Sequence, residues 1–249
     1  MTSSGERRAV PPVTAADVHH HLEQLFARGE VQAEDESWVP LEPHALAEAD
    51  ARGIRDLAIS ERVGTTLEVG LGLGVGTLSL CEALLEVGRP DAHHVVVEPF
   101  PSEFFGGAGL RTVRAAGLEH LVEMVQGESQ LVLPRLVVEG RRFDFALIDG
   151  DHSFQAIFLD LCFADRLVRP RGLVIVDDLW IRAIRLAVSY AEHNFDWELL
   201  PEAMMGAFRW RRLRNLPRRR LRGTGNVAIL RRPTEPPDRP GLDSLVPFT

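Results

Sequence analysis

Acidic side chains crowd the end of an apolar run in FDFALIDGDHSF, residues 143–154. The run is followed at once by Asp149, Asp151 and His152. Beside a buried strand, ionised carboxylates are costly unless they are paired, hydrogen-bonded or bound to a metal ion. These residue types in this order therefore predict a functional site at the end of a core strand.

A second apolar run, LVIVDD, ends in the same way with Asp177 and Asp178. Neighbouring parallel strands lie about 4.8 Å apart, so these two side chains could converge on Asp149. Three like charges at such a separation repel strongly unless a cation lies between them. An all-oxygen ligand set suits Mg²⁺, with Ca²⁺ or Mn²⁺ as alternatives. The sequence predicts a divalent-metal site formed by Asp149, Asp177 and Asp178.

Asp151 and His152 are candidates for a general base that takes a proton from a substrate hydroxyl. A metal ion at the aspartates would help by lowering the pKa of that hydroxyl. Two other interpretations stay open. One is a metal-free site in which His152 or Asp151 is the base, and the other is a structural cluster in which Asp151 or Ser153 caps the next helix. Asp144, at the opposite end of the strand, is expected to be structural.

Four glycines, Gly70, Gly72, Gly74 and Gly76, separate an earlier strand from its helix in LEVGLGLGVGTL. Glycines let the backbone adopt positive φ and approach a ligand closely. Such a loop suits a nucleotide-like cofactor at the carboxyl edge of a parallel sheet. Glu98 ends the next strand, where an acid can bind ribose hydroxyls.

Two details favour S-adenosylmethionine over NAD as this cofactor. The glycines are spaced Gly-x-Gly-x-Gly-x-Gly, whereas the NAD pattern is Gly-x-Gly-x-x-Gly. Glu68 lies two residues before the first glycine, where its carboxylate could support the loop or meet the ammonium group of the cofactor. An NAD site and a tight turn without a ligand are the alternatives.

The first glycine loop resembles that of class I methyltransferases. GESQLVLPRL (127–136) resembles a segment of catechol-type O-methyltransferases, which implies that Glu128, Ser129 and Gln130 meet the adenine. Two later segments are similar to the corresponding pair of segments in the same superfamily, namely FDFALIDGDHSFQAIFLDL and LVRPRGLVIVDDL. They are closest to bacterial enzymes that methylate sugar hydroxyls on macrolides and aminocoumarins. The resemblance spans about residues 36–232.

The resemblance implies a cofactor site that also includes Asp149, the acid that ends the strand predicted at 143–149. Its expected members are Glu68, Gly70, Gly72, Gly74, Glu98, Glu128, Ser129, Gln130 and Asp149. Two positions depart from the catechol-type pattern, which has Lys where this chain has His152 and Asn where it has Asp178. Metal dependence is therefore an open question.

Continuous apolar strands alternate with helical periodicity from residue 65 onward, which indicates a parallel sheet covered on both faces. We expect an α/β chain with a Rossmann-like class I methyltransferase fold and a seven-stranded, mostly parallel sheet. Strands are predicted at 65–70, 93–99, 121–127, 143–149, 173–178, 196–201 and 226–232. Helices are predicted at 14–28, 43–59, 76–88, 106–118, 129–140, 153–168 and 181–193. Residues 29–42 are expected to be irregular, and 170–172 to form a turn.

The chain divides into four expected parts: a disordered lead (1–12), an N-terminal helical lid segment (13–60), a cofactor-binding core (61–232) and a loose C-terminal tail (233–249). The lid is expected to cover the methyl acceptor. His19, His20 and His21 belong to it; they are consecutive, so they cannot all face one metal ion. Trp38 and His44 are candidates for either lid contacts or packing.

A cluster of eight arginines and no acid occupies residues 209–222. The net charge of −8 argues mildly against a dedicated nucleic-acid binder, and all 28 basic residues are Arg. We expect a solvated or subunit-facing loop, with contact to an anionic substrate or to nucleic acid as the alternatives.

Cys81 and Cys162 both fall in helix-like segments, so a structural disulfide is not expected and a cytoplasmic location is the default. Neither a signal peptide nor an apolar run of roughly 18 residues is visible. The expected partner is a small molecule with a hydroxyl, such as a sugar, polyketide or phenol; a homo-oligomer is an open alternative. The expected activity is S-adenosylmethionine-dependent O-methylation, with an NAD-dependent oxidoreductase and a binding module using the Arg cluster as rivals.

Overall fold

Seven strands form one sheet in a computed structural model of the chain, which describes residues 12–200 and 226–235. The strand order is β5-β4-β3-β6-β7-β9-β8, and β9 pairs antiparallel with both of its neighbours. The other pairs are parallel. The strands are β3 (Thr65–Val69), β4 (His93–Glu98), β5 (Val122–Gln126), β6 (Phe143–Ile148), β7 (Val168–Val176), β8 (Glu198–Leu199) and β9 (Ala228–Arg231). The predicted α/β class and seven-stranded, mostly parallel sheet are confirmed.

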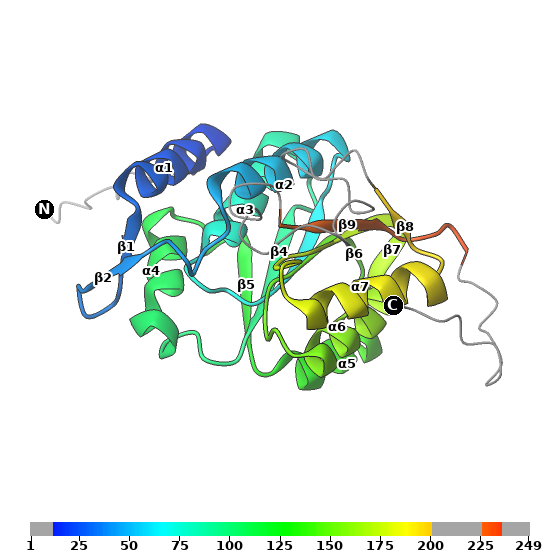
Figure 1. Cartoon of the computed structure of the whole chain (residues 1–249). Coiled ribbons are helices and arrows are strands. Elements are labelled where there is room, and N and C mark those ends of the chain that lie inside the picture. Colours follow the sequence, from blue (N-terminus) through cyan, green and yellow to red (C-terminus); the bar gives the residue numbers. More distant parts are fainter. Residues whose placement is uncertain (1–11, 201–225, 236–249) are drawn as a thin grey trace, which may run out of the picture.

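Helices cover both faces of this sheet, as Figure 1 shows. One face packs against α1 (Ala15–Arg28), α2 (Glu48–Ser60), α3 (Val75–Val87) and α4 (Ala108–Ala115), which the short helix η1 (Phe104–Gly107) precedes. The other packs against α5 (Ser129–Val138), α6 (Phe154–Leu167) and α7 (Arg182–Asn194). Most strands therefore contribute alternate side chains to two apolar layers, whereas β3 places the buried polar residues Thr66 and Glu68 on one face.

The strand order reverses at β3. From β3 the chain proceeds to β4 and β5 on one side, and it then returns to β6 on the other side of β3. In open α/β sheets, ligands bind in the crevice outside the carboxyl ends of the strands at such a reversal. The glycine loop that follows β3 and the acids that follow β6 and β7 all lie at this edge.

The structure corrects three local predictions. Residues 29–42 contain a hairpin of β1 (Glu30–Gln32) and β2 (Trp38–Pro40). Helix α2 starts at Glu48 and not at Pro43, because the backbone of residues 41–45 closes a turn through the amides of His44 and Ala45.

The third correction concerns the expected turn at 170–172, which is part of β7. Here Arg171 N–H donates to the Arg232 carbonyl and Arg232 N–H donates to the Gly172 carbonyl. The pairing with β6 shifts register between Phe143 and Phe145. The strand β9, distant in sequence, thus supplies hydrogen-bond partners that extend β7 through the Pro-Arg-Gly segment.

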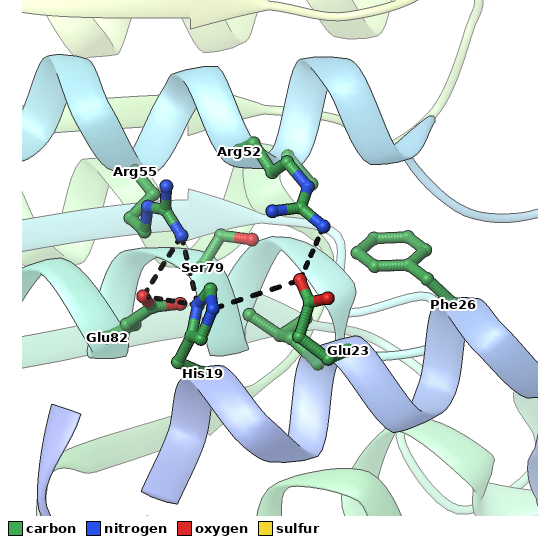
Figure 2. Close-up of a pocket in the computed structure, with 9 residues that line it drawn as sticks. His19, Glu23, Phe26, Arg52, Arg55, Ser79 and Glu82 are labelled. Carbon is green, nitrogen blue, oxygen red and sulfur yellow. Dashed lines mark hydrogen bonds and ion pairs between the residues drawn. The ribbon is translucent and has the colours of Figure 1, made fainter. Parts of the chain in front are cut away.

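Helix α1 packs across α2 and α3 through both apolar and charged contacts. Thr14 caps it in a capping box with Asp17, and Val18 and Leu22 are buried beneath it. Figure 2 shows His19 directed toward Glu82 of α3. The distance between His19 Nδ1 and Glu82 Oε1 is 3.0 Å. The shallow pocket between these helices is lined by none of the predicted cofactor or metal residues. Within the described part of the chain, no helix has the length and apolarity needed to cross a membrane.

Candidate functional site

The carboxyl ends of β6 and β7 bring acidic residues side by side. Ile148 and Val176 are partners in the parallel register, so Asp149 and Asp177 follow them on neighbouring strands. The Asp177 amide donates to the Ile148 carbonyl at 3.1 Å, which continues the ladder by one residue. One carboxylate oxygen each of Asp149 and Asp178 and one ring nitrogen of His152 lie within 4.8 Å of one another.

Asp178 reaches this group through an unusual backbone conformation. Its φ of +61° lies in the left-handed region, which Asp and Asn tolerate better than most residues. The carboxylate Oδ1 accepts hydrogen bonds from Trp180 Nε1 at 2.6 Å and from Asn226 Nδ2 at 2.8 Å. Its Oδ2 lies 3.1 Å from His152 Nε2. Asp178 is thus held from both sides.

The electrostatics of the group favour a bound cation. Burial, followed by the charges of Asp177 and Asp178, raises the pKa of Asp149 well above its usual range. Burial and the charge of Asp178 also raise the pKa of Asp177 to about 7. A cation between the carboxylates would relieve both the repulsion and the loss of hydration. Two carboxylates and one imidazole fit a divalent ion such as Mg²⁺ or Mn²⁺, with the nitrogen ligand shifting the balance toward Mn²⁺.

Asp177 is not part of the group of three that the structure brings together among its described residues. It is 8% exposed, and its Oδ1 has no hydrogen-bond partner there. Its other electrostatic neighbour is Asp50, a buried acid of α2. His152, predicted as a base, takes the third place in the cluster, and a role of Asp177 as a metal ligand stays a prediction.

The glycine loop lies directly against this acidic group. A Cβ atom on Gly70, which has φ of +94°, would come within 2.1 Å of the Asp149 carbonyl oxygen. A Cβ atom on Gly74, which has φ of +83°, would meet less crowding, with the Gly109 carbonyl oxygen and the Thr112 side chain both at 3.2 Å. The space beside Gly72 is open, because its Cβ would meet only the His44 carbonyl, at 3.8 Å. The loop therefore places the half-buried backbone of Gly70 and Gly72 next to the acids, where a cofactor could approach it closely.

Two buried glutamates hold the ends of the loop. Glu98 accepts from the Leu71 amide and from the Phe100 amide, both at 3.0 Å. Glu68 Oε2 accepts from Thr77 Oγ1 at 2.5 Å and lies 2.9 Å from His94 Nε2. These contacts tie β3, which precedes the loop, to α3 and β4, and the choice between the two predicted roles of Glu68 stays open. Glu98 stands where the ribose acid was expected.

Comparisons with known proteins agree with this architecture. Residues 67–179 match a family model described as a methyltransferase domain. An O-methyltransferase of Bacillus cereus in complex with S-adenosylhomocysteine matches at 18% identity and a TM-score of 0.58, over 90% of this chain and 93% of that one. TomG of Streptomyces achromogenes, involved in tomaymycin synthesis and solved with S-adenosylmethionine, matches at 18% identity and a TM-score of 0.59, over 91% and 92%. The chain has the class I methyltransferase fold.

Curated relatives match part of this methyltransferase fold. A flavonoid 3',5'-methyltransferase of Vitis vinifera is 28% identical over 53% of this chain and 54% of its own length. A candidate caffeoyl-CoA O-methyltransferase of Arabidopsis thaliana is 29% identical over 46% and 47%. The chain spans about half the length of the curated relatives that it matches. The predicted resemblance to methyltransferases is confirmed.

The predicted adenine residues lie at the start of α5 in this methyltransferase fold. Glu128 is the residue before the helix, and its carboxylate accepts a hydrogen bond from Gln130. Ser129 lies near Asp160 of α6. Burial raises the pKa of Asp160, and the Ser129 hydroxyl opposes this with a smaller lowering effect. The contact of Glu128, Ser129 and Gln130 with adenine stays a prediction.

The two predicted bases differ in their surroundings. Asp151 is exposed, and its Oδ1 accepts from the Ser153 amide at 2.7 Å, while Ser153 caps α6 through the Ala156 amide at 3.3 Å. This is the capping arrangement expected of the structural alternative. His152 is also exposed on one side, but its ring is paired with Asp178. The assignment of either residue as the base stays a prediction.

The remaining predicted residues have structural surroundings. Asp144 accepts from the amides of Gly64 and Thr65 and pairs with Arg169, which confirms its structural role. Trp38 lies under the Arg28 guanidinium at 4.5 Å.

The histidines of the expected lid segment (13–60) contact different partners. His20 lies 2.9 Å from Gln24, so it does not share the contact of His19 with α3. His44 packs against the Phe105 ring, and its carbonyl faces the glycine loop. The Arg cluster at 209–222, most of the 1–12 lead and most of the 233–249 tail lie outside the described residues.

Three residues of interest were not predicted. Asp160 lies in α6 at helical spacing from the buried residues Ile157, Leu161 and Ala164. Helical periodicity could therefore have identified it as a buried acid. Asp50 and Asn226 come from distant parts of the sequence, and no local pattern marks either of them. They meet the site because α2 and β9 pass the carboxyl end of β7.

Proposed function

We propose that the chain is an S-adenosylmethionine-dependent O-methyltransferase that acts on a hydroxyl of a small molecule with the help of a divalent metal ion. The contact between Gly70 and Asp149 carries the proposal. It puts the loop suited to the methyl donor directly beside the group suited to the acceptor. The methyltransferase-domain match over residues 67–179 supports the same reaction class.

The chain's own residues account for the steps of an in-line methyl transfer. The backbone beside Gly72 would receive the cofactor, and Glu98 would bind its ribose hydroxyls. Asp149 and Asp178, with His152 or Asp177, would hold the metal ion. When bound, the ion would lower the pKa of the acceptor hydroxyl. Fixing the acceptor oxygen near the donor methyl group supplies much of the remaining acceleration.

A metal-independent variant of this reaction is the second candidate, because His152 is paired with Asp178. A carboxylate that orients an imidazole can make it a general base, since it stabilises the imidazolium that forms. In this version His152 takes the acceptor proton and the aspartates do not need a cation. An acceptor such as a sugar, polyketide or phenol suits either version.

Binding and turnover separate these candidates. The protein is titrated by calorimetry with S-adenosylhomocysteine and with NADH, and methyl transfer from labelled S-adenosylmethionine to a panel of hydroxyl compounds is measured with Mg²⁺ or with EDTA. We expect S-adenosylhomocysteine to bind and NADH not to bind. Binding of NADH alone would reject the proposal, and full turnover in EDTA would favour the metal-independent version.

A further inference from the structure

Asn226 makes three contacts with the turn that carries Asp178. Its carbonyl oxygen accepts from the Leu179 amide at 2.9 Å, its Oδ1 accepts from the Trp180 amide at 3.1 Å, and its Nδ2 donates to Asp178 Oδ1 at 2.8 Å. The Asn226 side chain thus contacts the turn at Asp178 and again at Trp180. It comes from the segment leading into β9, 48 residues away from Asp178 in the sequence.

The turn needs such support because its backbone is strained. Asp178 has φ of +61°, a conformation that is unfavourable for residues other than glycine, although Asp and Asn tolerate it better than most. The strain persists only where neighbouring contacts hold it. Asn226 provides those contacts, and the indole of Trp180 adds a second donor to the same Oδ1.

Both donors engage Oδ1, which leaves Oδ2 for the site. Oδ2 lies on the side of His152, at 3.1 Å from Nε2. A carboxylate with one oxygen fixed by two hydrogen bonds has its plane and its second oxygen fixed as well. Asp178 therefore presents one oxygen in a defined direction, toward His152 and Asp149.

We propose that Asn226 is a positioning residue, which holds Asp178 so that its Oδ2 meets His152 and Asp149 in the geometry that binds the metal ion and the acceptor. The proposal rests on the function proposed above, because it assigns Asn226 a role in that site. Outer-shell partners of metal ligands commonly change metal affinity by roughly ten- to a hundredfold when they are removed.

Replacement of Asn226 with Ala tests the proposal, with Mn²⁺ as the probe. Calorimetry should show Mn²⁺ affinity falling by roughly tenfold or more, while affinity for S-adenosylhomocysteine stays within about twofold. Asn226→Ser, a smaller change, should show the same pattern if the Ala variant folds poorly. Trp180→Phe removes one of the two donors to Oδ1 and should give a smaller loss.

Asn194→Ala is the matched control. It deletes the same amide group at the C-terminal end of α7, where Nδ2 donates to the Tyr190 carbonyl at 3.3 Å, whereas the turn with Asp178 precedes the N-terminal end of this helix. It should lower the melting temperature without changing Mn²⁺ affinity. If Asn226→Ala leaves Mn²⁺ affinity unchanged, or lowers it no more than Asn194→Ala does, the positioning role is rejected.

Nuclear magnetic resonance separates a failure of this proposal from a failure of the proposed function. The ring nitrogen signals of His152, assigned with His152→Gln, should shift in Asn226→Ala without any metal, because Asp178 would leave its partner. The Trp180 amide should also exchange faster. Unchanged signals and exchange would overturn the positioning role, even in a protein that binds Mn²⁺. Changed signals in a protein that neither binds Mn²⁺ nor transfers methyl groups would support the positioning role and reject the function.

Discussion

The Nε2 atom of His152 lies 3.1 Å from Oδ2 of Asp178, at the ends of two neighbouring parallel strands. This pair joins the residue predicted as a base to a residue predicted as a metal ligand. His152 could therefore take a proton from the acceptor, or it could bind the metal ion through the same ring. Substitutions at this pair distinguish the two roles.

Replacement of His152 with Gln should lower kcat by roughly a hundred- to ten-thousandfold if His152 is the general base. Affinity for S-adenosylhomocysteine should not change, because the glycine loop is untouched. Steady-state kinetics and calorimetry measure the two quantities. Asp151→Asn is the control, with a smaller expected effect because Asp151 faces solvent. A larger loss in Asp151→Asn than in His152→Gln would instead make Asp151 the base.

Mg²⁺ or Mn²⁺ should raise the melting temperature of the wild-type protein. A ligand at about 100 times its dissociation constant stabilises the folded state by about 2.7 kcal/mol, and here it also relieves the repulsion that raises the pKa of Asp149. Thermal unfolding with and without EDTA measures this effect. Asp149→Asn should abolish the response, whereas Asp144→Asn, at the other end of β6, should be less stable but still respond. A response that survives in Asp149→Asn would place the ion elsewhere.

Replacement of Glu98 with Gln should weaken binding of S-adenosylhomocysteine by roughly tenfold or more. The amide can no longer accept from both the Leu71 and the Phe100 amides, and charge-assisted hydrogen bonds contribute about 1.5–3 kcal/mol each. Calorimetric titration provides the comparison. The exposed Glu103→Gln should bind like the wild type. Equal affinities for all three proteins would remove Glu98 from the cofactor site.

Asp160 should make stability depend on pH. It is fully buried, and burial, which outweighs the opposing effect of the nearby Ser129 hydroxyl, raises its pKa from 3.8 to about 6. Because the folded state then binds the proton more tightly than the unfolded state, the contribution of this group to stability is greatest below pH 3.8 and is lost as the pH rises to 6.

Asp160→Asn removes this dependence. Relative to the wild type, the variant should become more stable by about 2 kcal/mol between pH 4 and pH 7. Urea unfolding at the two pH values measures the difference. The exposed Asp56→Asn should show no such change. A stability difference between Asp160→Asn and the wild type that is the same at both pH values would show that Asp160 is not protonated in the folded state.

The strands and the mostly parallel character of the sheet were predictable because burial on both faces produces continuous apolar runs. The runs ending at Ile148 and Val176 also located the acidic edge. The local details depend on contacts that no run of residues encodes. β7 extends through Arg171 only because β9 pairs with it.

The composition of the cluster was less predictable for a related reason. The spacing of neighbouring strands predicted that Asp177 and Asp178 would both converge on Asp149. The left-handed backbone at Asp178, held by a distant Asn226, brings this residue to His152 as well as to Asp149, whereas Asp177 is not part of that group. The sequence therefore located the acidic edge of the sheet, but it did not determine which side chains meet there.

The close packing of Gly70 on the Asp149 carbonyl has a practical consequence for protein engineering. In the proposed reaction, the donor and acceptor sites would share one backbone junction that leaves no room for even a methyl group. Attempts to change which compound is methylated should therefore leave this junction intact. They should alter exposed aromatic residues elsewhere, such as Phe104.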